Sequence, residues 1–311
     1  MSDRAREVQV VRAGLLTTVQ DAGRPSLAHL GVPRSGALDV GAWRLANRLA
    51  GNAEDAAALE TTVNGVTLRA CSRCSAAVAG AQAAVTVNGK QAGWGIPVVL
   101  GPGDILNVGP ATAGVRCYVA CSGGVAVPPV FGSRATDLLS GLGPPPVRDG
   151  DILPLGPVQG MPPAVDFAPY PAPAADVVLT LHPGPRYDWL SEDGMACLAE
   201  GTWSPASASN RIALRLEGPR LDRAVQGELP SEGIVLGSVQ VPPDGQPLIF
   251  LADHPTTGGY PVVGIVDPAD IGTCAQAGVG ATVSFHVTNR RGALPAGAAA
   301  ESAVSPGGEL K

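Results

Sequence analysis

The sequence predicts a mainly β protein, made of two lobes with a few short helices. Glycine (41) and proline (30) together approach a quarter of the 311 residues, and so many breakers suit short strands joined by turns better than long helices. Apolar residues make up 45% of the chain, enough for a substantial core, but aromatic residues make up only 4%. The core must therefore be built from Val, Leu, Ile and Ala.

A proline-rich segment near the middle of the chain separates the two lobes. Seven prolines fall between positions 154 and 173, and no hydrophobic periodicity crosses them, which is typical of an extended linker. We therefore expect an N-terminal β lobe over residues 1–155, a linker over 156–175 and a C-terminal β lobe over 176–290. Residues 291–311 are rich in Ala, Gly, Ser and Pro and are predicted to be a disordered tail.

Short apolar runs bounded by turn residues predict the strands of both lobes. In the first lobe they are expected at residues 8–11, 83–87, 96–100, 105–108 and 115–120. In the second lobe they are expected at residues 177–181, 212–216, 248–251, 262–266 and 282–287. The string Gly-Asp-Ile-Leu occurs at 103–106 and again at 150–153, and in each copy we expect a Gly-Asp turn directly before a strand.

Two short helices are predicted among the strands. Between residues 37 and 49, apolar side chains recur at intervals of four, three and four, which places them on one helix face. Asp39 suits the positive start of this helix and Gly51 suits its end. A second helix is expected after Asp267-Pro268, with Asp267 as its cap and Gly278 at its end.

Composition and charge exclude several classes of function. The formal net charge is −6 and the longest basic run is Arg290-Arg291, so no binding surface for nucleic acid or for an anionic membrane is expected. The charged start lacks the apolar core of a signal peptide, and no stretch is apolar enough to span a bilayer, so we expect a cytoplasmic protein. The six cysteines are expected to be reduced, and no metal site is expected because Cys71-Ser-Arg-Cys74 lacks a second ligand pair.

Common catalytic signatures are missing from the sequence. It contains no phosphate-binding loop, no dinucleotide fingerprint, no Gly-x-Ser-x-Gly elbow and no His-Glu-x-x-His pair. Neither lysine, Lys90 or Lys311, lies in the tight turn between two methionines that a biotin carrier needs. We therefore expect no covalent biotin on this chain.

Two dense motif blocks carry the functional signal. The first runs from Gln20-Asp21-Ala22-Gly23-Arg24-Pro25 to Gly31-Val32-Pro33-Arg34-Ser35-Gly36-Ala37-Leu38-Asp39. The second comprises Ser231-Glu232-Gly233, Val239-Gln240-Val241-Pro242 and Ala252-Asp253-His254-Pro255-Thr256-Thr257-Gly258-Gly259-Tyr260-Pro261. Such residues shape loops and present polar groups rather than filling a core. We therefore predict that the two blocks converge on one polar cavity.

These blocks resemble the 5-oxoprolinase C-subunit family, also called KipA-like, allophanate hydrolase subunit 2 or the biotin-dependent carboxyltransferase family. The matches continue in order through Ala46-Asn47-x-Leu49-x-Gly51-Asn52, Leu59-Glu60 and Asp244-Gly245-Gln246-Pro247, and they cover roughly residues 8–290. The resemblance implies two cyclophilin-like β-barrel lobes. The sequence departs from the family pattern at His254-Pro255, where Arg-Gln is usual, and at Asn210, where the family has Asp.

The resemblance also implies a function. It indicates the C-subunit of an ATP-dependent 5-oxoprolinase, a cyclic-amide hydrolase that opens the lactam of 5-oxoproline to glutamate. The implied partners are the A-subunit and a KipI-like B-subunit, and ATP with Mg²⁺ would act through their complex. Two alternatives stay open. One is carboxyl transfer from a separate biotinyl carrier to a urea-like amide, and the other is a non-enzymatic module that antagonises a histidine-kinase inhibitor.

Three residues of the second block are the candidates for acid–base catalysis: Asp253, His254 and Glu232. For His254, the alternative to a proton shuttle is a hydrogen-bonding or positively charged contact. For Asp253 and Glu232, the alternative is that their carboxylates accept hydrogen bonds from the backbone of the loops. Glu60 either closes the predicted helix onto the first block or is a buried hydrogen-bonding strut.

Arg24 is the first candidate for holding a substrate carboxylate or phosphate, because a guanidinium donates two parallel hydrogen bonds. The alternative is that it pins its own loop to Asp21 or Asp39. Residues 256–259 offer hydroxyls and backbone N–H groups for an anion nest, the alternative being a tight hairpin whose glycines are needed for positive φ. The remaining substrate-binding candidates are Asp21, Ser35, Gln240, Gln246, Thr256, Thr257, Gly258, Gly259 and Tyr260.

Overall fold

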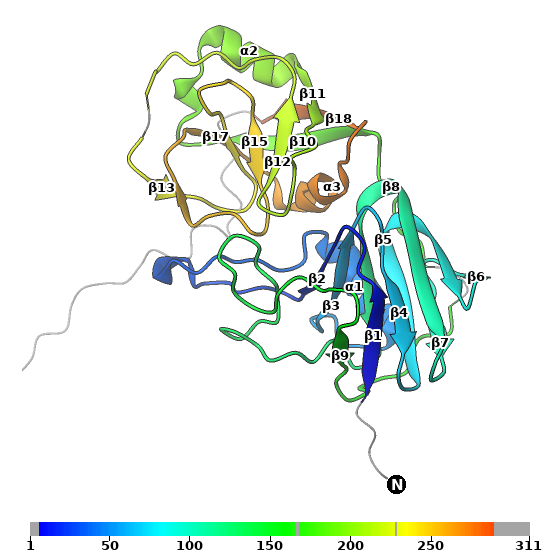
Figure 1. Ribbon diagram of the computed structural model, residues 1–311. Coiled ribbons are helices and arrows are strands. Elements are labelled where there is room, and N and C mark those ends of the chain that lie inside the picture. The colour runs from blue at the N-terminus through cyan, green and yellow to red at the C-terminus, as the bar shows by residue number, and fades with distance from the viewer. Residues whose placement is uncertain (1–5, 166–167, 228, 289–311) are drawn as a thin grey trace, which may run out of the picture.

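The computed structural model describes residues 6–165, 168–227 and 229–288, which form two β lobes (Figure 1). Among these residues, the first lobe is a curled nine-stranded sheet and the second is a closed seven-stranded barrel. The prediction of a mainly β fold with two lobes and a few short helices is confirmed. The tail predicted for 291–311 lies outside the described residues.

The sheet of the first lobe is built around two long antiparallel strands. Strand β8 (Ile105–Cys121) pairs with β5 (Cys74–Val87), and their register is irregular between Gly80 and Val85. Such irregularities bend a strand pair, so the runs predicted at 105–108 and 115–120 form one curved strand. The other strands of this lobe are β1 (Glu7–Arg12), β2 (Leu16–Gln20), β3 (Ala58–Thr62), β4 (Thr67–Ala70), β6 (Lys90–Ala92), β7 (Val98–Leu100) and β9 (Ile152–Pro154).

The two predicted Gly-Asp turns are both present. The Asp104 carboxylate accepts a hydrogen bond from the Gly101 amide at 2.7 Å, and the Asp151 carboxylate accepts one from the Arg148 amide at 2.8 Å. One turn leads into β8 and the other into β9. The repeated string therefore starts a strand in the same way in both places.

Helix α1 (Val40–Ala50) covers one face of the first sheet, packing on β5 and β8. Its N-cap is Asp39, whose carboxylate accepts from the Ala42 amide at 3.0 Å, and its C-cap is Gly51 with φ 78°. A side-chain cap at the start and a left-handed glycine at the end are the expected terminators of a helix. The helix predicted between 37 and 49 is confirmed, with its first turn starting at residue 40.

The second lobe closes because its first and last strands pair in parallel. Strand β10 (Asp176–Pro183) runs beside β18 (Thr282–Val287), from Asp176 opposite Thr282 to Leu181 opposite Val287. All five strands predicted for this lobe are present. The barrel is completed by β17 (Val262–Val266), β14 (Ser238–Gln240), β15 (Leu248–Phe250), β12 (Ala213–Glu217) and β11 (Thr202–Pro205).

Two α-helices belong to the second lobe. The predicted one is α3 (Ile271–Gln276), which follows a 3-10 turn (Pro268–Asp270) capped by Asp267. The sequence analysis missed α2 (Glu192–Glu200), which is capped by Ser191 and buries only Gly194 and Leu198. With so little of its surface buried, α2 has no long apolar stripe for periodicity to reveal.

Shorter elements lie beside the barrel and between the lobes. A two-stranded ribbon joins β13 (Glu232–Gly233) to β16 (Thr257–Gly258), and two further 3-10 turns span Ala28–Leu30 and Tyr187–Trp189. In the predicted linker, the Tyr170 hydroxyl donates to Asp39 Oδ1 at 2.6 Å. The linker is therefore attached to the start of α1.

Three further findings concern the described part of the chain. None of its helices is long and apolar enough to cross a membrane. It contains no group of three or more His, Cys, Asp or Glu side chains placed to hold a metal ion. All six cysteines are free, and four of them are buried.

Candidate functional site

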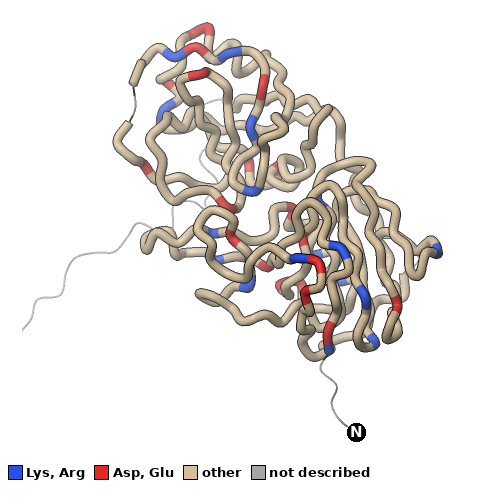
Figure 2. The backbone as a smooth tube through the Cα atoms, in the orientation of Figure 1, with Lys and Arg blue, Asp and Glu red and all other residues tan. Residues whose placement is uncertain are grey.

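The two motif blocks meet where the lobes touch. The Ser35 hydroxyl lies 2.9 Å from Asp253 Oδ1, and the Ser35 amide donates to the Ala252 carbonyl at 3.0 Å. These residues are more than two hundred positions apart in the sequence, so the contact joins the first lobe to the barrel. Figure 2 shows acidic and basic residues together in this region.

Two glycines let the first block fold tightly on itself. Gly23 has φ 77°, and a Cβ placed there would lie 2.5 Å from the Arg34 carbonyl oxygen. Gly36 has φ 95°, and its Cβ would lie 2.9 Å from the Gly23 nitrogen. The backbone therefore crosses itself at a distance that only glycine permits. This crossing places Arg24, Arg34 and Ser35 side by side in the cleft.

Asp21 organises the loop around this crossing. Its Oδ1 accepts from the Gly23 amide at 2.9 Å and from the Ser133 hydroxyl, and its Oδ2 accepts from the Arg134 amide at 2.6 Å. Both carboxylate oxygens are thus used within the protein. The structure gives Asp21, predicted to bind substrate, a clear role in holding the loop at 133–134.

Arg24 is almost fully buried, with 1% of its surface exposed. Its Nε donates to the Val130 carbonyl at 3.0 Å and its Nη2 to the Ala135 carbonyl at 2.7 Å, whereas Nη1 has no hydrogen-bond partner among the described residues. Burial lowers the pKa of this guanidinium, and neighbouring carboxylates oppose that change. Arg24 therefore pins the loop at 130–135, not Asp21 or Asp39, and keeps one donor unused.

Asp253 makes four contacts with three groups and is completely buried. Arg211 contacts it with two nitrogens, at 2.9 Å and 3.0 Å, while the Ser35 hydroxyl and the Leu138 amide lie at 2.9 Å and 3.0 Å. The lone pairs of this carboxylate are used in contacts within the protein. The geometry therefore shows Asp253, a predicted base, as a connection between the lobes.

Arg211 also reaches the first lobe, where it contacts Glu60 Oε1 and donates to the Gly36 carbonyl at 2.7 Å. Glu60 Oε2 accepts from the Tyr118 hydroxyl at 2.7 Å and from the Leu38 amide at 3.1 Å. Burial acts to raise the Glu60 pKa, but Arg211 and Arg116, with these hydrogen bonds, outweigh it and hold the pKa below its usual value. Glu60 is thus a buried strut, one of its two predicted roles.

We call Glu60, Arg116, Arg211 and Asp253 the buried ionic seam. Arg116 Nε lies 3.6 Å from Glu60 Oε1 within the first lobe, Arg211 pairs with Asp253 within the second, and the contact of Arg211 with Glu60 crosses the lobe boundary. The sequence analysis did not single out Arg211. Its only signal was its place in the segment 209–216, beside the departure at Asn210.

His254 is 6% exposed and lies beside the seam. Its Nδ1 is 2.8 Å from the Pro255 carbonyl oxygen, which only accepts hydrogen bonds, so Nδ1 carries the proton. Burial is the main cause that lowers the pKa of this imidazole below its usual value, and Arg34 adds to the effect. His254 is therefore neutral near pH 7, and the lone pair of Nε2 accepts no hydrogen bond from the described residues.

A cavity of about 300 Å³ lies between the two blocks, and we call it the small cavity. Its polar lining comes from Arg24, Ser26, Arg34, His254 and Thr256. The Arg34 side chain is exposed and makes no hydrogen bond or ion pair with any residue in the described part of the chain. The rest of the wall is mostly apolar, contributed by Pro25, Ala28, Val32, Ile234, Val235 and Leu236.

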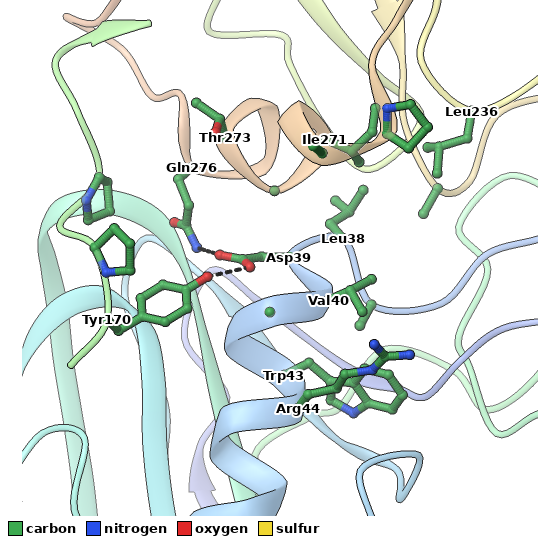
Figure 3. Close-up of a pocket in the computed structure, with 18 of the residues that line it drawn as sticks. Leu38, Asp39, Val40, Trp43, Arg44, Tyr170, Leu236, Ile271, Thr273 and Gln276 are labelled. Atoms are coloured by element: carbon green, nitrogen blue, oxygen red, sulfur yellow. Dashed lines mark hydrogen bonds between the residues drawn. The ribbon is translucent and has the colours of Figure 1, made fainter. Parts of the chain in front are cut away.

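A larger cavity of about 630 Å³ lies between α1, α3 and the linker, and we call it the large cavity (Figure 3). Asp39 is in its wall, where Oδ1 accepts from Tyr170 and Oδ2 accepts from the Gln276 amide at 2.8 Å. The large cavity shares Arg34 and Leu236 with the small cavity. The two cavities are therefore adjacent, with Arg34 at their boundary.

The other predicted residues of the second block lie in and around the β13–β16 ribbon. The Gln240 amide donates to the Tyr260 carbonyl at 2.9 Å, and Glu232 is ion-paired with Arg186. Neither Gly258 nor Gly259 has positive φ, which contradicts the alternative that these glycines are needed for a left-handed hairpin. A Cβ at Gly258 would instead lie 3.0 Å from the Gln240 side chain. Of residues 256–260, Thr256 lines the small cavity and Thr257 is exposed.

Gln246 lies away from this cluster. It exchanges hydrogen bonds with the Gly218 backbone at 2.9 Å and 3.1 Å. Gly218 follows the last residue of β12, whereas Asp253 follows the opposite end of the paired strand β15. Gln246 and Asp253 are therefore at opposite ends of the barrel strands.

Comparison with known proteins places these features in a family. The carboxyltransferase domain family, subdomain A and B, matches residues 30–287. The chain is 35% identical over 294 residues to the 5-oxoprolinase C-subunit of Escherichia coli, covering 93% of this chain and 94% of that protein.

Solved structures give the same result. The crystal structure of TTHA0988 matches with a TM-score of 0.83 at 35% identity, covering 92% of this chain and 56% of that one. The K. lactis urea amidolyase structure matches with a TM-score of 0.82 at 29% identity, covering 92% of this chain and 19% of that one. The chain therefore belongs to the carboxyltransferase domain family that includes the 5-oxoprolinase C-subunit.

Proposed function

We propose that this protein is the C-subunit of an ATP-dependent 5-oxoprolinase, and that it opens the lactam of 5-oxoproline to glutamate together with an A-subunit and a KipI-like B-subunit. The observation that carries the proposal is the extent of the match, because it runs through 93% of this chain and 94% of the E. coli protein. The contact of Ser35 with Asp253, which joins the two motif blocks at one cleft, supports it.

The small cavity is the part of the cleft that suits this substrate. It combines a neutral imidazole at His254 with an apolar wall, and its volume of about 300 Å³ is at the lower end of the ~300–1,000 Å³ range of ligand pockets. His254 Nε2 can accept a hydrogen bond from a lactam N–H. Residues of this chain would thus bind and orient the ring, while activity requires the partner proteins.

ATP with Mg²⁺ does not fit the large cavity. Asp39 in its wall would repel the phosphates, and both its oxygens already accept hydrogen bonds from Ala42, Tyr170 and Gln276, so it is not free to bind Mg²⁺. We therefore propose that the nucleotide binds elsewhere in the complex with the A- and B-subunits.

Reconstitution tests the proposal. The chain is combined with the A- and B-subunits, and glutamate release from 5-oxoproline is measured with and without ATP and Mg²⁺. We expect turnover only when all components are present. We expect His254→Ala to reduce the rate on the order of tenfold or more, and His29→Ala, at an exposed histidine, to leave it unchanged. An assembled complex that releases no glutamate would overturn the proposal.

A second candidate is carboxyl transfer to a urea-like amide from a biotinyl carrier on another protein. The likeness to K. lactis urea amidolyase, with a TM-score of 0.82, favours it. The reconstituted complex would then carboxylate urea only when a biotinylated carrier is added, and it would release no glutamate from 5-oxoproline.

A further inference from the structure

We propose that the small cavity is a carboxylate-binding site in which Arg34 makes the contact with the ligand, so that it selects a small cyclic amide with a carboxylate over a neutral one. The choice of 5-oxoproline as the natural ligand rests on the proposed function. The site itself rests on the charges and contacts described here, and it holds whichever anion the complex uses.

The Arg34 side chain is a cation without a charged partner among the described residues. Arg34 lines the small cavity, is exposed, and has no hydrogen-bond or ion-pair partner for its side chain among the residues that the structure describes. Its backbone is nevertheless fixed, because its carbonyl accepts from the Arg24 amide at 2.7 Å and the next residue, Ser35, is bonded to the barrel. A guanidinium held at its base and free at its tip matches the two oxygens of a carboxylate.

A second feature of the small cavity is the unused donor of Arg24. Arg24 is 1% exposed, and two carbonyls fix its Nε and Nη2, but the buried Nη1 has no partner in the described part of the chain. Buried polar groups are almost always hydrogen-bonded, and an exception calls for an explanation such as a missing ligand or water. Because Arg24 also lines the small cavity, its positive charge adds to the attraction for an anion there.

A third feature of the small cavity is the absence of competing acid in the lining. The small cavity is lined by two arginines and no Asp or Glu among the described residues. The nearby Asp253 is held in the buried ionic seam by Arg211, and Asp21 by the loop at 133–134. The positive charge is therefore directed to whatever enters the cavity.

The remaining lining of the small cavity is mostly apolar. Ile234, Leu236 and Val32 line the cavity and suit the methylene groups of a small ring. His254 supplies a hydrogen-bond acceptor at Nε2, because Nδ1 is bonded to the Pro255 carbonyl. A ring that carries a carboxylate beside an N–H, as 5-oxoproline does, offers one group to Arg34 and the other to His254. A neutral amide would leave the cations without a partner.

The large cavity provides the contrast and the control. Besides Arg34, the large cavity is lined by a second exposed arginine, Arg44. Arg44 lies 3.8 Å from Glu54, so the positive charge of Arg44 is partly balanced. Arg44 lines the large cavity but not the small one. Replacing Arg44 therefore removes an exposed arginine of the same cleft while leaving the proposed site intact.

The test measures binding to the full-length chain, alone and in the complex with the A- and B-subunits, by titration with NMR or calorimetry. The probes are 5-oxo-L-proline, cyclopentanecarboxylate as a ring with carboxylate but no amide, and 2-pyrrolidone as the lactam without carboxylate. We expect both carboxylates to bind more tightly than 2-pyrrolidone. We expect Arg34→Ala to weaken carboxylate binding on the order of tenfold or more, Arg34→Lys to restore part of it, and Arg44→Ala to change nothing.

The outcomes separate this inference from the proposed function. If Arg34→Ala, folded as judged by circular dichroism, binds 5-oxo-L-proline like the unaltered chain, the inference is wrong even if the complex releases glutamate. It is equally wrong if 2-pyrrolidone binds as tightly as the carboxylates, or if no probe binds to the chain or the complex. If carboxylates bind through Arg34 but no glutamate is released, the site stands and the proposed function fails.

Discussion

The buried ionic seam and the small cavity lie beside each other, yet they use their charges in opposite ways. In the seam, Arg211 contacts Glu60, Asp253 and the Gly36 carbonyl. In the small cavity, the Arg34 side chain makes no hydrogen bond or ion pair with the described residues, and Arg24 keeps Nη1 unused. A buried charge is tolerated when it is paired and hydrogen-bonded. The paired groups therefore hold the lobes together, and the unpaired ones are those available to a ligand.

The largest loss of stability is expected from a substitution of Arg211 in the buried ionic seam. Arg211→Met removes the cation and leaves Glu60 and Asp253 buried without it, which should cost about 3–5 kcal/mol of unfolding free energy. Urea denaturation followed by circular dichroism measures the loss. The matched control is Arg215→Met, four residues further on, where the side chain is exposed. A loss no greater than that of the control would contradict the role given to the seam.

A smaller effect is expected at the backbone crossing that serves both regions. Gly23→Ala places a Cβ 2.5 Å from the Arg34 carbonyl at φ 77°, whereas Gly31→Ala has φ 74° and no atom within 4 Å. Both changes carry the conformational cost of about 1 kcal/mol for a left-handed alanine, and only the first adds a clash. Gly23→Ala should therefore lower the melting temperature clearly more than Gly31→Ala. Equal melting temperatures would mean that the crossing is not tight.

The smallest expected effect is on the way in which stability depends on pH. The pKa of His254 is lowered in the folded protein, mainly by burial, so below its ordinary value near 6.5 the unfolded chain binds a proton more readily than the folded one. The contribution of neutral His254 to stability is then fully present above about pH 6.5, and this contribution is lost as the pH falls through the folded pKa. Charged neighbours that act on the imidazole are Arg34, Asp253 and Asp137.

His254→Asn keeps a donor near the position of Nδ1 and removes the titration. Melting temperatures measured from pH 7.5 to 5 should fall less steeply for this variant, by at most the effect of one proton. The exposed His29→Asn variant should follow the unaltered chain. A slope unchanged by His254→Asn would show that the imidazole does not titrate differently on folding.

Several of the strands and two of the helices could be predicted because their signals are local. Apolar runs, caps such as Asp39 and Asp267, and the two Gly-Asp turns each lie within a few residues. The fusion of two runs into β8 depends on its pairing with β5. Helix α2 was missed because only Gly194 and Leu198 of its nine residues are buried.

The candidate site could be predicted in outline only. The two blocks were predicted to converge, and the Ser35–Asp253 contact joins them. Sequence patterns do not show which polar groups are used up by distant partners. Asp253 is bonded to Arg211 and Leu138, whereas the Arg34 side chain has no hydrogen-bond partner among the described residues, and only the three-dimensional arrangement shows this difference.

The parallel pairing of β10 with β18 has a consequence for synthesis. The barrel needs its last strand, Thr282–Val287, beside its first, Asp176–Pro183, so it cannot close until Val287 has left the ribosome. The first lobe, complete by Pro154, has all its strands much earlier. A nascent chain arrested before residue 282 should hold Glu60 and Arg116 without a docked Arg211, which makes assembly of the cleft the final event of folding.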